Sequence, residues 1–156
     1  MSIEKVRDYF KELGIEDRII EFSVSSATVA LAAEALGCKP EYIAKSLTFK
    51  SEDSAIMVVA AGDARVDNRK FKETFGIKAK MLTADEAVTL IGHAVGGVCP
   101  FAVNCGIKIY LDESLRRFDY VYPACGSSNS AIKLSLDELI SFSKADGWCD
   151  VCKLPE

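Results

Sequence analysis

Seven consecutive apolar residues, AIMVVAA, occupy positions 55–61. A strand with one face in water alternates polar and apolar side chains, whereas this run has no polar face. It is far shorter than the ~18–20 apolar residues that cross a bilayer. The run therefore predicts a central β-strand that is buried on both faces, and the rest of the chain must supply the layers that cover it.

Helical and strand patterns alternate on both sides of this run and are joined by short turns. Helices are predicted over residues 2–13, 25–36, 68–75, 84–91 and 135–143, and further strands over residues 18–23, 44–50, 77–82, 105–112, 119–126 and 131–136. Ser25 or Ser26 is expected to cap the second helix. Asp67 and Thr83 are expected to cap the two that follow. This alternation predicts an α/β fold with a mixed sheet, in a single domain over residues 1–156.

A lysine stands at the start of the predicted strand AKSLTFK. Side chains alternate along a strand, so Lys45 shares a face with Leu47 and Phe49. Two interpretations fit a charge in that position. The aliphatic stem can cover apolar surface while the ammonium group reaches water. Alternatively, the lysine is held at the rim of a cleft, where it meets an anion or polarises a carbonyl group.

The overall charge limits the possible partners. The chain carries a net charge of −4 and has a sequence pI near 5.1. Extensive binding of nucleic acid requires a basic surface, so we do not expect an extensive nucleic-acid interface. Contact with one or two phosphates is compatible with this net charge. The N-terminal residues MSIEKVRDYF have no apolar signal core, and no run is long enough to span a membrane. We therefore expect a cytoplasmic protein without a membrane partner.

Six cysteines are present, and they are expected to be free thiols: Cys38, Cys99, Cys105, Cys125, Cys149 and Cys152. The last two form a CxxC pair. A redox CxxC normally precedes a helix that lowers the thiol pKa, and only KLPE follows here. A structural zinc site would need two further ligands, of which Cys125 or Cys38 could supply one. Ordinary packed cysteines are favoured over both.

The segment GHAVGGVCPF, residues 92–101, concentrates three glycines and a proline. Glycine allows backbone N–H groups to approach a ligand closely, so this loop could present several donors to an oxyanion. It could also be a tight connection between a helix and a strand. The segment contains His93, the single histidine, so a site with two histidines is excluded within one chain. A Cys99–His93 nucleophilic pair stays open but is not favoured.

These segments together resemble the YbaK/ProX family of aminoacyl-tRNA deacylases, which are free-standing relatives of the editing domain in some bacterial prolyl-tRNA synthetases. The resemblance covers residues 23–140. Its marks are the lysine in IAKSL, the GxxxP loop from Gly96 to Pro100, and the GD pair at Gly62 and Asp63 between them. Cys99 departs from the pattern, since many members have serine there.

The resemblance implies a mixed, barrel-like β-sheet surrounded by helices. It also implies hydrolysis of the ester that joins a wrong amino acid to the 3′ end of a tRNA, with Cys-tRNA(Pro) and Ala-tRNA(Pro) as expected substrates. A synthetase pocket shaped for proline cannot strongly exclude a smaller side chain, because a missing methylene changes binding by only ~1–3 kcal/mol. The expected partners are the tRNA acceptor end and prolyl-tRNA synthetase, and no cofactor or metal is expected.

The resemblance also assigns candidate site residues. The catalytic candidates are Lys45, Gly96, Gly97, Val98, Cys99 and Pro100, and the substrate-binding candidates are Thr28, Ser46, Gly62, Asp63 and His93. Amides of Gly96 to Cys99 would hold the developing oxyanion, and Lys45 would lie across the cleft. Thr28 and Ser46 would line the amino-acid pocket, while Asp63 would hold the loop or the substrate amine. No obvious general base is present, so a positioned water or a group on the substrate would attack.

Two other classes of function remain. The same pocket could bind an acceptor end without hydrolysing the ester, as a non-catalytic module. A thiol or zinc protein would depend on Cys149 and Cys152 alone.

Overall fold

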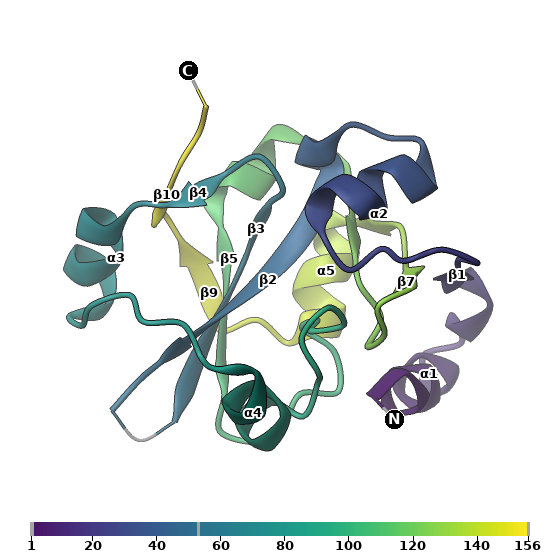
Figure 1. The fold of residues 1–156 in the computed structure, drawn as a ribbon, viewed down its shortest axis with the longest axis horizontal. Coiled ribbons are helices and arrows are strands. Elements are labelled where there is room, and N and C mark those ends of the chain that lie inside the picture. The colour runs from purple at the N-terminus through teal and green to yellow at the C-terminus, as the bar shows by residue number, and fades with distance from the viewer. Residues whose placement is uncertain (1, 53, 156) are drawn as a thin grey trace.

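The computed structural model describes residues 2–52 and 54–155. Within them a six-stranded sheet curls into a half-barrel (Figure 1). Its order is β8 (Leu134–Ser135), β6 (Tyr120–Pro123), β2 (Ile43–Lys50), β3 (Ala55–Ala61), β5 (Lys108–Asp112) and β9 (Gly147–Cys149). The β2–β3 and β6–β8 pairs are antiparallel, whereas β2–β6, β3–β5 and β5–β9 are parallel. The predicted mixed sheet is thus confirmed.

Helices and two small ladders surround this sheet. The helices are α1 (Ser2–Glu12), α2 (Val29–Leu36), α3 (Asn68–Phe75), α4 (Ala84–Glu86), which continues into the π-helical turn η3 (Ala87–Ile91), and α5 (Leu136–Ser143). Short 3₁₀ turns are η1 (Glu16–Arg18), η2 (Pro40–Tyr42) and η4 (Glu113–Arg117). One ladder pairs β1 (Ile20–Glu21) with β7 (Ser130–Ala131), and the other pairs β4 (Arg65–Val66) with β10 (Cys152–Lys153).

The apolar run at the centre of the sequence forms β3, and all seven of its residues are buried. It lies between β2 and β5. Helix α3 covers this part of the sheet through Phe71, which contacts Phe49, and Phe75, which contacts Tyr110. Burial of such aromatic side chains supplies a large share of the stabilisation of a core. The prediction of a strand covered on both faces is confirmed.

The second helix starts later than its sequence indicates. Its N-cap is Thr28, whose Oγ1 accepts a hydrogen bond from the Leu31 amide. The prediction of Ser25 or Ser26 as the cap is wrong, because both serine hydroxyls donate to the Ser128 carbonyl instead. The segment before α2 is therefore fixed to Ser128. The predicted caps Asp67 and Thr83 are both confirmed.

Residues 77–82 were expected to form a strand, and that prediction is wrong. Only Met81 makes a β-bridge, to Phe49. The segment nevertheless covers the outer edge of β2, because the Leu82 amide donates to the Thr48 carbonyl and the Lys50 amide donates to the Lys80 carbonyl. The predicted strand over residues 131–136 is divided between two ladders, since β7 pairs with β1 and β8 pairs with β6.

Candidate functional site

A cavity of about 290 Å³ opens where the N-terminal end of α2, strand β2 and the glycine loop meet. Five of the predicted site residues line it: Thr28, Lys45, Ser46, Gly96 and Val98. Leu47, Met81 and Tyr122 complete much of its apolar wall. The structure thus brings the strand lysine and part of the GxxxP loop to one small site, although they are far apart in the sequence.

The ammonium group of Lys45 is held by backbone oxygens. Its Nζ donates to the Gly62 carbonyl at 3.3 Å and to the Ala64 carbonyl, in the turn after β3. Burial lowers the pKa of Lys45 from its usual value. Two carbonyl dipoles therefore offset part of the desolvation that the charge undergoes, and they fix where the charge lies.

The GD pair forms the support for this lysine. A side chain at Gly62 is impossible without movement, because a Cβ would lie 2.1 Å from the Pro40 carbonyl oxygen. Asp63 makes a bidentate ion pair with Arg117 of η4, with distances of 2.6 and 3.0 Å. This guanidinium lowers the pKa of the Asp63 carboxyl group. Both Gly62 and Asp63 stay outside the cavity wall, where they position the carbonyl groups that bind Lys45.

The glycines of the loop allow it to pack tightly against its neighbours. Gly96 has φ of +95°, and a Cβ on Gly97 would lie 2.7 Å from the backbone of Gly126 and Ser127. The Gly97 amide donates to the Ala94 carbonyl, so it is already occupied. Among the hydrogen bonds of residues 2–52 and 54–155, none uses the amide of Gly96 or Val98. The amide of Cys99 is likewise unused there, but Gly96 and Val98 line the cavity, so their amides are donors that the loop retains at this site.

His93 and Cys99 lie behind the loop in the core rather than in the cavity wall. His93 Nε2 is 2.7 Å from the Phe101 carbonyl oxygen and 3.6 Å from Cys99 Sγ. A carbonyl oxygen only accepts, so Nε2 carries the hydrogen and has no lone pair for the thiol. Burial lowers the pKa of His93 and raises the pKa of Cys99 to about 12. The structure brings His93 and Cys99 together, but both are buried in the core, where His93 hydrogen-bonds to the loop backbone.

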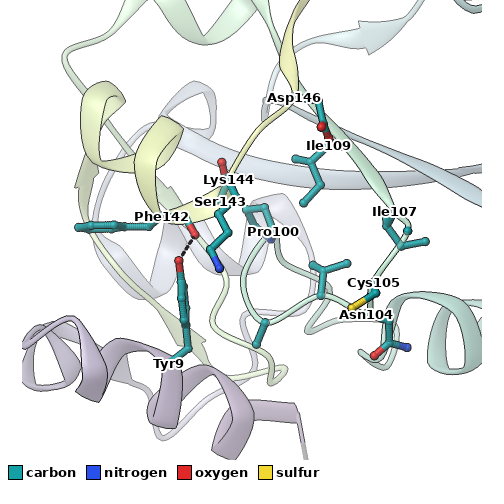
Figure 2. Close-up of a pocket in the computed structure, with 13 residues that line it drawn as sticks. Tyr9, Pro100, Asn104, Cys105, Ile107, Ile109, Phe142, Ser143, Lys144 and Asp146 are labelled. Atoms are coloured by element: carbon teal, nitrogen blue, oxygen red, sulfur yellow. Dashed lines mark hydrogen bonds between the residues drawn. The ribbon is translucent and has the colours of Figure 1, made fainter.

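Pro100 lines a second cavity, of about 250 Å³, and not the first one. Figure 2 shows it near the point where the Tyr9 hydroxyl donates to the Phe142 carbonyl, which joins α1 to α5. Lys45, Gly96 and Val98 are not among the lining residues of this second cavity. Pro100 is therefore not among the described residues that line the first cavity.

Of the two predicted pocket hydroxyl groups, that of Ser46 is not accessible in the cavity, whereas that of Thr28 keeps its O–H as a donor. The oxygen of Thr28 caps α2. The Oγ of Ser46 is buried and has no hydrogen-bond partner in the part of the chain that the structure describes. The sequence did not identify Met81 and Tyr122 as lining residues of the cavity. They lie far along the chain from Lys45 and Ser46, and only the fold brings them together. Leu47 could have been found, since it shares a strand face with Lys45.

The C-terminal thiols occupy strands rather than a surface site. Cys149 lies in β9 and Cys152 in β10, and burial raises the pKa of each to about 12. Among the described residues, no group of three or more His, Cys, Asp or Glu side chains is placed to hold a metal ion. The same residues contain no helix with the length and apolar character needed to cross a membrane.

Comparisons with known proteins identify the family and the fold of this chain. The family profile described as "Aminoacyl-tRNA editing domain" matches residues 24–142. The uncharacterized protein YwhH of Bacillus subtilis is 51% identical over 154 residues, which are 98% of each chain. The proline–tRNA ligase of Halalkalibacterium halodurans is 29% identical over 66% of this chain and 18% of the ligase. A crystal structure described as a candidate trans-editing enzyme for prolyl tRNA synthetase superposes with a TM-score of 0.86, 29% identity and 97% coverage of both chains.

Proposed function

This chain belongs to the aminoacyl-tRNA editing domain family, and on that premise we propose that it is a trans-editing hydrolase for mischarged tRNA. The reaction is cleavage of the ester between a wrong amino acid and the 3′ end of the tRNA, with Ala-tRNA(Pro) and Cys-tRNA(Pro) as substrates. The observation that carries this proposal is that Lys45, Gly96 and Val98 line one cavity. They supply a cation and two N–H groups of the loop at the same site.

The size and chemistry of the cavity fit a small, uncharged amino acid. Its volume of about 290 Å³ is at the lower end of the range for ligand pockets. Among the described residues of its wall, Lys45 is the only Lys, Arg, His, Asp or Glu, and most of the other lining residues are apolar. A small aminoacyl group fits such a space, and longer or charged side chains are excluded by size and desolvation.

The proposed mechanism relies on positioning and charge stabilisation. As a water oxygen bonds to the ester carbon, negative charge develops on the carbonyl oxygen, and the amides of Gly96 and Val98 donate to it. The ammonium of Lys45 stabilises the same charge or orients the terminal ribose. The bond from the ester carbon to the ribose oxygen then breaks, and a proton passes to that oxygen. No carboxylate or imidazole lies in the described cavity wall, so the water is activated by a group of the substrate.

The test is hydrolysis of tRNAs charged with alanine, cysteine, serine, threonine and proline, by the wild type and by Lys45→Met. Methionine keeps an unbranched stem but lacks the charge, so we expect kcat to fall roughly 100-fold on the preferred substrate. Lys72→Met, on the exposed face of α3, is the matched control and should retain wild-type activity.

Full activity of Lys45→Met would remove Lys45 from the mechanism. Binding of mischarged tRNA without any turnover by the wild type would instead identify a non-catalytic binding module.

A further inference from the structure

Strand β2 has a gap in the pairing of its outer edge. The backbone groups of alternate residues point in the same direction, and those of Thr48 and Lys50 bond to residues 80–82, away from β3. Ala44 pairs with β6, which ends at Pro123. Ser46 lies between these two covered stretches. Its N–H and C=O groups point to the same edge by this periodicity, and no hydrogen bond to either is formed by residues 2–52 and 54–155.

Ser46 reaches the cavity through its main chain. Its Oγ is fully buried and unpaired, yet the residue as a whole remains half-buried and lines the cavity. The accessible atoms of Ser46 therefore belong to the main chain and Cβ. The cavity presents one backbone donor and one backbone acceptor from a single residue, at the gap in the sheet edge.

An unpaired backbone N–H and C=O at a partly buried site require partners, and the occupant of the cavity can supply them. In an antiparallel hydrogen-bonded pair, two residues exchange both N–H···O bonds. An aminoacyl group carries a donor and an acceptor with this spacing, its α-ammonium group and its ester carbonyl group. Water provides neither a fixed spacing nor a positive charge.

We propose that the aminoacyl group of the substrate binds beside Ser46 as a one-residue strand. The α-ammonium donates to the Ser46 carbonyl oxygen, and the ester carbonyl accepts from the Ser46 N–H. This inference rests on the proposed function, and it adds a third backbone donor to those of Gly96 and Val98. These two hydrogen bonds involve groups that all aminoacyl esters share. Selection among amino acids therefore depends on the apolar wall of the cavity, which contacts the amino-acid side chain.

The experiment compares three esters on the same tRNA: alanyl, N-acetylalanyl and lactyl, in which a hydroxyl replaces the ammonium. Each enzymatic rate is corrected for the spontaneous hydrolysis of that ester. Acetylation removes the positive charge and leaves a neutral amide N–H that carries an acyl group, so we expect kcat/KM for N-acetylalanyl-tRNA to fall roughly 10- to 100-fold. Lactyl-tRNA also has a neutral donor but carries no acyl group beside it, so its kcat/KM should lie between those of the other two esters.

A second arm changes the protein. Ser46 is replaced by its α-hydroxy acid, so that an ester oxygen takes the place of its N–H while its side chain and C=O stay in place. We expect kcat to fall roughly tenfold, with an unchanged circular dichroism spectrum because this N–H has no partner in the sheet. Equal rates for alanyl- and N-acetylalanyl-tRNA would overturn the inference and leave the proposed function intact. No hydrolysis of alanyl- or cysteinyl-tRNA would overturn both.

Discussion

Lys45 combines two properties that are usually separate in a lysine. Its stem lies in a strand face with Leu47 and Phe49, while its ammonium reaches the carbonyl groups of the turn at residues 62–64. An aliphatic residue would pack equally well but would leave those carbonyl groups without a donor. Removing the donor leaves partly buried carbonyl oxygens without a hydrogen bond, which destabilises the fold. A change in the turn therefore alters the position of the Lys45 ammonium, and a change of Lys45 destabilises the turn.

Adding a single Cβ atom at Gly97 should disturb both the stability and the activity of the protein. In Gly97→Ala the new Cβ would lie 2.7 Å from the backbone of Gly126 and Ser127, so the loop must move. We expect a loss of about 1–3 kcal/mol in the free energy of unfolding. We expect a loss of roughly 100-fold in kcat, since a displacement of about 1 Å is sufficient for that. Urea unfolding and deacylation assays measure the two effects.

The control for this substitution is Gly147→Ala in β9. A Cβ there has no atom within 4 Å and the backbone needs no positive φ, so stability should stay within about 0.5 kcal/mol of the wild type. Equal effects of the two substitutions would show that close packing of the loop is not what Gly97 provides.

The first turn of helix α2 forms part of the cavity wall. Thr28 and Val29 line the cavity, and the Thr28 oxygen accepts from the Leu31 amide. Thr28→Ala removes the cap, which should lower the free energy of unfolding by about 1 kcal/mol. Because the freed end of the helix borders the site, we expect kcat/KM to fall as well. Thermal unfolding and deacylation kinetics check the two parts.

Two comparisons separate capping from contact with the substrate. Thr28→Ser keeps the capping oxygen and should restore both stability and activity. Thr83→Ala removes the cap of α4, outside the cavity wall, and should lower stability with little effect on kcat/KM. If Thr28→Ser restores stability but not activity, the methyl group of Thr28 contacts the substrate directly.

Elements with a strong local signal could be predicted, and those defined by distant partners could not. The seven apolar residues of β3 and the caps Asp67 and Thr83 carry their signal within a few positions. Residues 77–82 alternate like a strand, but only Met81 finds a bridge partner. The sequence also could not show the gap at Ser46, because it exists only where β6 ends beside β2. Lys45 and the glycine loop were predicted together through a family resemblance rather than through spacing.

At the scale of the whole molecule, the curled sheet buries most of the thiol groups. Cys99, Cys125, Cys149 and Cys152 are buried, Cys38 is half-buried, and Cys105 is exposed. They come from separate strands and loops, so their exposure reports on the integrity of the whole fold. The acidic net charge of −4 likewise belongs to the whole chain, and it favours few phosphate contacts over a broad nucleic-acid surface.

The burial of these thiols predicts a stepwise reaction with a disulfide reagent such as dithionitrobenzoate. The thiolate is the reactive form, and burial raises the pKa of Cys99, Cys149 and Cys152 to about 12 and that of Cys125 well above its usual value. In native protein at pH 8, we expect Cys105 to react first and Cys38 more slowly. The four buried thiols should react only after unfolding in guanidinium chloride.

Cys105→Ser is the control, and it should remove the fast phase while leaving the slower ones unchanged. The same preparation treated with EDTA should keep its melting temperature, because the described residues provide no cluster of metal ligands. A rapid reaction of Cys149 or Cys152 in the native state, or a melting temperature that depends on zinc, would contradict this view of the tail. The rapid reaction would mean that β9 and β10 open in solution, and the zinc dependence would mean that the protein binds a metal ion.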